Sequence, residues 1–202
     1  FAFRESVTSW ELSRPTGVVS EVIEAGSEPV GQYVTVIHGP YQWSREMNHR
    51  FNSVADLLDI RLRERIREEA GGSYAIGAGG WRWRYPEPWA YTQISFGMDP
   101  ARREELSTMA IEVVEEVRTT LASDDYIERI KAQQRESYRQ SLQENQYWLS
   151  TLQFYVQHGR DPATITEFPE LIESLTAEDI RDAADRFLDP RRRIELSLVP
   201  EP

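Results

Sequence analysis

The stretch RIREEAGGSYAIGAGG, residues 65–80, carries the strongest structural signals in the sequence. Its charged first part ends at a pair of glycines, and glycine ends helices readily because it adopts the left-handed conformation without a Cβ clash. The part after the pair alternates, as strands do. The stretch therefore predicts a helix that ends near Gly71 and a strand that follows it, with Arg67 before the break and Tyr74 after it.

The sequence around this stretch predicts two strands before the helix and a hairpin after it. Residues 18–26 and 32–39 are rich in β-branched residues in rough alternation, and we expect them to pair as neighbours across a short loop. Residues 44–69 carry apolar side chains at three- and four-residue steps, the helical period. An antiparallel hairpin is predicted from about 72 to 97, with its tip at the proline-broken WRWRYPEP, residues 81–88.

Helix-start signals dominate the second half of the chain. Asp99 before a proline and Ser123 before two aspartates are typical helix N-termini, and the helical pattern continues over 144–159 up to a glycine. Thr176 opens a last helix in a capping-box pattern, and residues 191–200 alternate as a final strand. This order predicts a two-layer α+β fold with a mixed or antiparallel sheet and helices on one face.

Composition limits the classes of function. The net charge of −11 disfavours nucleic acid as a partner, because both would be anionic. The absence of cysteine excludes disulfides, thiolate nucleophiles and cysteine-based zinc sites. No apolar run reaches the roughly 18 residues of a membrane-spanning helix. The chain begins at Phe1, so we expect a piece of a longer polypeptide, with 1–16 as a lead-in and 17–202 as one domain.

Familiar catalytic patterns are missing. The three histidines, at 38, 49 and 158, do not form H-E-x-x-H or H-x-x-E-H, so we expect no metal site and no catalytic residue on this chain. His158, at a predicted helix end, suits the negative end of the helix dipole. Ser73 lacks the surroundings of a nucleophile elbow, and Arg82 stands where the dinucleotide fingerprint needs its last glycine.

Two features leave alternatives open. Arg67 and Tyr74 could face the same side of the sheet, or Arg67 could pair with Glu64 one helical turn earlier while Tyr74 lies in the core. The segment WRWRYPEPW, residues 81–89, gathers three tryptophans and two arginines. It could bind an extended peptide, or it could pack on a neighbouring domain.

Four segments resemble a known family. IREEAGGSY (66–74) resembles the R-x-x-x-x-x-x-Y element in the zinc-free half of the insulinase/pitrilysin family of inverted-motif zinc peptidases. YPEPWAYTQISFGMDPARREEL (85–106) is similar to a strand and helix of the bacterial zinc-protease branch, and SLQENQYWLSTLQ (141–153) to a helix downstream. The ending 175–202 is similar to the family's closing helix and strand. The resemblance runs from about residue 17 to the end.

The resemblance implies a role in proteolysis. Such enzymes have two halves that close around a peptide, with zinc and a glutamate base in the H-x-x-E-H half. Arg67 and Tyr74 match the arginine and tyrosine that reach the substrate from the zinc-free C-terminal half.

This chain would then be inactive alone and need the zinc-binding half and a peptide substrate as partners. Its compartment would be the periplasm or cytoplasm of a bacterium. The alternative is a non-catalytic assembly or chaperone-like subunit of the same fold.

Overall fold

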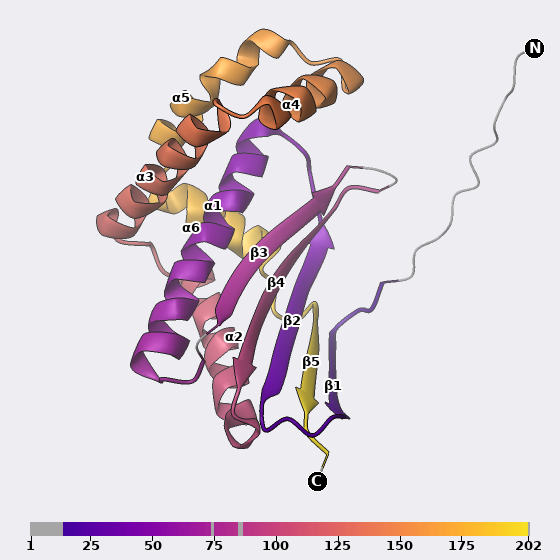
Figure 1. The fold of residues 1–202 in the computed structure, drawn as a ribbon. Coiled ribbons are helices and arrows are strands. Elements are labelled where there is room, and N and C mark those ends of the chain that lie inside the picture. The colour runs from indigo at the N-terminus through magenta and orange to yellow at the C-terminus, as the bar shows by residue number, and fades with distance from the viewer. Residues whose placement is uncertain (1–13, 74, 85–86, 202) are drawn as a thin grey trace, which may run out of the picture.

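The computed structural model of the protein describes residues 14–73, 75–84 and 87–201. Its centre is a five-stranded sheet with the strand order β1-β5-β2-β4-β3 (Figure 1). Residues 1–13 of the predicted lead-in lie outside the described residues. The strands are β1 (Val18–Glu24), β2 (Gly31–Pro40), β3 (Ile76–Trp83), β4 (Trp89–Met98) and β5 (Arg193–Val199).

The sheet is mixed, as predicted, but one predicted neighbour pair is wrong. β1 pairs with β5 in parallel, and β5 pairs with β2 antiparallel, so the C-terminal strand lies between the two N-terminal ones. Alternation marks a segment as a strand without saying which strand lies beside it. The hairpin prediction is confirmed, because β3 and β4 pair antiparallel from Ile76↔Phe96 to Trp83↔Trp89.

The predicted helix over 44–69 is confirmed, with a change of winding near its end. Helix α1 (Arg45–Leu62) begins at Ser44, whose Oγ accepts the Met47 N–H at 3.0 Å. It continues as the π-helical turn η1 (Arg63–Glu69). The chain then reverses at Gly71, whose φ of +59° is the left-handed conformation expected of glycine there.

The remaining helices start largely where the capping signals predict. They are η2 (Pro100–Arg102), α2 (Arg103–Thr119), α3 (Asp124–Ser141), α4 (Asn145–Gln157) and α6 (Ala177–Phe187). The Thr176 capping box is complete, with Thr176 and Asp179 each accepting the other's backbone N–H. Two further helical segments were not predicted from the sequence, η3 (Pro162–Glu167) and α5 (Phe168–Ser174). No helix in the described part is long and apolar enough to cross a membrane.

The core lies between the sheet and one helical layer. Helices α1, α2 and α6 pack on a single face of the sheet, and α3 and α5 pack against α1 (Figure 1). On β4 every second residue from Ala90 to Met98 is buried, as alternation across a pleated sheet requires. Each large side chain buried there, such as Phe51 or Leu58, contributes about 1.5–3 kcal/mol to stability.

The other face of the sheet is open in the described part of the chain. The pairing register places the side chains of Trp81, Trp83, Ile23, Leu196 and Leu198 on this face, and all five are exposed. The fold therefore presents one buried and one open sheet surface, and strands β3 and β4 contribute to both.

Candidate functional site

Arg67 lies on η1, and its side chain is exposed. It lines a hollow of about 380 Å³ together with Arg63, the first residues of β3 and Ser95 of β4. The π-helical winding carries the chain from α1 to this position beside the edge of the sheet. The structure thus places Arg67 in the lining of this hollow, together with Arg63.

The alternative pairing of Arg67 with Glu64 is not observed. Glu64 instead accepts hydrogen bonds from the Tyr126 hydroxyl at 2.6 Å and from Arg129 at 3.0 Å. Burial alone would raise the pKa of Glu64, but these hydrogen bonds outweigh burial and hold the pKa below its ordinary value. Among the described residues Arg67 forms no ion pair, so its guanidinium is available to a ligand.

The predicted partner, Tyr74, lies outside the described residues. The glycine pair before it is closely packed. A Cβ on Gly72 would lie 2.4 Å from a methyl carbon of Leu106, and the Gly72 N–H donates to the Ile66 carbonyl at 2.8 Å. Ser73 is buried and donates to the Ala75 carbonyl at 3.1 Å, which gives its hydroxyl a structural partner.

The three histidines lie on different elements, and each has structural contacts. His49 is buried, and its Nε2 lies 2.8 Å from the Gln134 side-chain oxygen. His38 is buried beside Trp89 and Tyr91, and His158 ends α4 with its ring 4.4 Å from that of Phe154. No group of three or more potential ligands that could hold a metal ion occurs within residues 14–73, 75–84 and 87–201.

The hairpin of β3 and β4 places its side chains alternately on the two faces of the sheet. Trp81 and Trp83 are each 51% exposed on the open face, with the Trp83 ring edge-on to Tyr91 at 4.9 Å. Arg82 points the other way and donates to Asn48 at 2.8 Å and to Asn52 at 2.9 Å. The tryptophans are thus free to contact a peptide or a neighbouring domain, whereas Arg82 ties the hairpin to α1.

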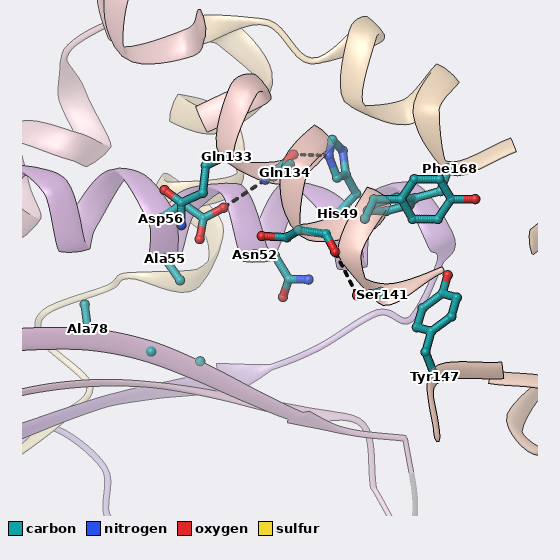
Figure 2. A pocket seen from close by; sticks show the side chains of 14 residues that line it. His49, Asn52, Ala55, Asp56, Ala78, Gln133, Gln134, Ser141, Tyr147 and Phe168 are labelled. Atoms are coloured by element: carbon teal, nitrogen blue, oxygen red, sulfur yellow. Dashed lines mark hydrogen bonds between the residues drawn. The ribbon is translucent and has the colours of Figure 1, made fainter. Parts of the chain in front are cut away.

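A second cavity was not predicted from the sequence. It has a volume of about 510 Å³ and lies between α1, α3 and the edge of β3 (Figure 2). Gln134 bridges its wall, with its amide nitrogen 2.9 Å from an Asp56 oxygen and its amide oxygen 2.8 Å from His49. These residues are 78 and 85 positions apart, so no local pattern in the sequence connects them.

Comparisons with known proteins agree with the resemblance. No family model matches the chain. Over 142 residues the chain is 24% identical to the probable zinc protease PqqL of Haemophilus influenzae, an alignment that covers 66% of this chain and 15% of that protein. The chain therefore spans about 15% of the length of this relative.

Solved structures match the fold over nearly the whole chain. The periplasmic protease PqqL of Escherichia coli matches with a TM-score of 0.81 at 22% identity, over 98% of this chain and 22% of that one. A mutant of the ferredoxin protease FusC, in complex with Arabidopsis ferredoxin, gives 0.81 at 20% identity over 98% and 22%. An inactive M16 peptidase domain from Pseudomonas fluorescens gives 0.79 at 15% identity over 94% and 45%.

The fold also occurs in the first half of one of these proteases. The first half of the Escherichia coli PqqL also matches, with a TM-score of 0.75 at 11% identity over 98% of this chain and 45% of that one. The fold alone therefore does not say which half the chain resembles. The comparisons confirm the resemblance to the zinc peptidases named from the sequence, and the chain has the α+β fold of an M16 peptidase domain.

Proposed function

We propose that the chain is a domain of the zinc-free half of a zinc metallopeptidase, and that this half binds the substrate. The enzyme would cleave peptides or unfolded polypeptides inside a closed chamber that its two halves form. The observation that carries this proposal is the exposed, unpaired guanidinium of Arg67 beside a hollow at the sheet edge. The similarity to a zinc protease supports the class of reaction.

The metal of such an enzyme would lie in another part of the protein, since the described residues offer no ligand group. When bound in the other half, zinc supplies the activated water for peptide hydrolysis. Arg67 would then contribute N–H donors fixed in one plane, aimed at the carbonyl oxygen on which negative charge develops. Donors placed before the reaction starts lower the barrier without reorganisation.

In the sequence the glycine break separates Arg67 from Tyr74. Gly72 packs on Leu106 too closely to accept a side chain, so the turn has little freedom. A phenol held on the segment after this turn would act beside Arg67 on the same oxygen. Since both groups belong to the zinc-free half, hydrolysis would require the two halves to close.

A second candidate is a non-catalytic assembly or chaperone-like subunit. The open sheet face favours it, because exposed Trp81, Trp83 and Leu196 could hold an unfolded segment without any chemistry. The two functions differ in whether the polypeptide that contains this domain carries H-x-x-E-H elsewhere. They differ also in whether Arg67 and Tyr74 affect a rate.

The test is kinetic and uses the whole polypeptide that contains this domain. We expect Arg67→Ala and Tyr74→Phe each to lower kcat on a short quenched peptide by about 10² to 10³, as the loss of one oxyanion donor does. The melting temperature should stay unchanged, because Arg67 is exposed and forms no ion pair with a described residue.

Arg65→Ala is the matched control. Arg65 lies on the same turn, pairs with Glu69 at 3.1 Å and does not line the hollow, so its loss should leave kcat unchanged. Wild-type rates for Arg67→Ala, or a loss that follows unfolding, would show that Arg67 has no part in the reaction.

A further inference from the structure

Strand β3 forms one edge of the sheet and has unpaired backbone groups along part of it. The Ala78 N–H donates to Asp59 Oδ1 at 3.1 Å, so the backbone of Ala78 points away from β4. In an antiparallel pair the backbone groups of every second residue point the same way, and those of Gly80 and Arg82 therefore face the edge as well. Within the described residues the edge-facing backbone groups of Gly80 and Arg82 have no hydrogen-bond partner.

The 510 Å³ cavity opens directly onto this edge. Figure 2 shows Ala55 and Asn52 on α1 above the strand that carries Ala78. The strand side is lined by Ala78, Gly79 and Gly80, which have little or no side chain. A second backbone could therefore approach β3 closely enough to pair with it, as when an extended peptide adds a strand to a sheet.

The opposite wall carries one carboxyl group, that of Asp56. Asp56 is the only charged residue that lines the cavity in the described part, and no arginine or lysine described by the structure pairs with it. Gln134 donates to its Oδ2 at 2.9 Å, which leaves Oδ1 without a described partner. Burial raises the pKa of Asp56; the Gln134 hydrogen bond opposes this shift, and the charge of Asp59 adds to it. A cation in the cavity would relieve that unfavourable environment.

We propose that this cavity binds an extended polypeptide segment that pairs with the free backbone groups of Gly80 and Arg82 on the β3 edge and places a lysine or arginine side chain against Asp56. This inference rests on the proposed function for the class of ligand, and it adds where the segment lies and which side chain it carries. The net charge of −11 favours cationic peptides over long range as well.

The probe is a fluorescein-labelled heptapeptide, Thr-Val-Thr-Lys-Thr-Val-Thr, whose binding to the full chain is measured by anisotropy. We expect it to bind about tenfold more tightly than the analogue with glutamine in place of lysine, the contribution of one charge-assisted pair. Asp56→Asn should abolish this preference. Methylation of alternate peptide nitrogens should remove binding of both peptides, because the methylated edge cannot pair with β3.

Two comparisons separate this effect from unfolding and from net charge. An asparagine at 56 still offers an oxygen to Gln134 and needs no charge in this half-buried position, so Asp56→Asn should raise the melting temperature at neutral pH. Glu104→Gln makes the same change in net charge on a side chain that is 87% exposed on α2. It should leave the lysine preference intact.

The outcomes also separate this inference from the proposed function. If Asp56→Asn keeps the lysine preference, or if the methylated peptide binds normally, the inference is wrong even where the whole enzyme cleaves peptides through Arg67. If the preference depends on Asp56 and the whole polypeptide cleaves nothing, the inference holds and the peptidase assignment fails.

Discussion

His38 lies on the open face of the sheet and is nevertheless only 4% exposed. The rings of Trp89 and Tyr91 lie 5.9 and 6.1 Å from it, and neither ring nitrogen has a hydrogen-bond partner among the residues described. Burial lowers the pKa of His38, and the charges of Arg14 and Arg192 lower it further. The fold therefore favours the neutral form of His38.

We expect this histidine to make the protein less stable in mild acid. Because the folded pKa lies below the unfolded one, its contribution is complete above about pH 6.5 and is lost as the pH falls from there. His38→Phe keeps a ring of similar size and cannot take up a proton. Urea unfolding at pH 7.5 and pH 5.0 should show a smaller stability loss for the variant than for the wild type. Burial lowers the pKa of His49 too, so some loss should remain. Equal losses would contradict the argument.

Individual residues also show what the sequence could not predict. The position of Arg67 on the last helical turn before a glycine break was readable, because both signals are local. That Glu64 would be taken by Tyr126 and Arg129 was not, because those partners lie 62 and 65 residues away. Asp56 is likewise an ordinary helix carboxylate until α3 brings Gln134 against it.

At the scale of one element, β3 has two adjacent glycines that differ in the space available for a side chain. A Cβ on Gly80 would lie 2.3 Å from a ring carbon of Phe51, which is 2% exposed, whereas a Cβ on Gly79 meets open space. We expect Gly80→Ala to lower the free energy of unfolding by about 1–3 kcal/mol, as overpacking does. Gly79→Ala is the control and should be neutral or slightly stabilising. Urea unfolding of both variants measures the difference, and equal effects would contradict this packing.

Elements were predictable where their ends carry chemical signals. Ser44, Asp99 and Thr176 accept the N–H groups that their helices leave open, as their side chains predict. The segment 162–174 was missed because few apolar residues hold it, with Ile165 and Ile172 buried. The order of strands could not be read either, since pairing between β1 and β5 joins residues about 175 positions apart, such as Val18 and Arg193.

For the whole molecule, the main electrostatic feature is its excess of negative charge. Many ion pairs are exposed and join residues close in sequence, such as Arg139–Glu136 and Arg102–Glu105. Such pairs contribute little to stability, so screening them with salt costs little. The excess of 34 acidic over 23 basic side chains instead leaves a net repulsion in the compact state. We expect the melting temperature to rise across a sodium chloride series as this repulsion is screened. A constant or falling midpoint would show that the ion pairs matter more than the excess charge.

The central position of β5 has a consequence for synthesis on the ribosome. β5, the strand that joins β1 to β2, is the last of the five to be made, so β1 has no sheet partner until β5 leaves the exit tunnel. Until then the nascent chain holds β2, β3 and β4 with one side of β2 unpaired, and such an edge readily pairs with other chains. The sheet can be completed only after translation of this segment has ended, and a nascent-chain chaperone would have its longest opportunity to bind at the unpaired side of β2.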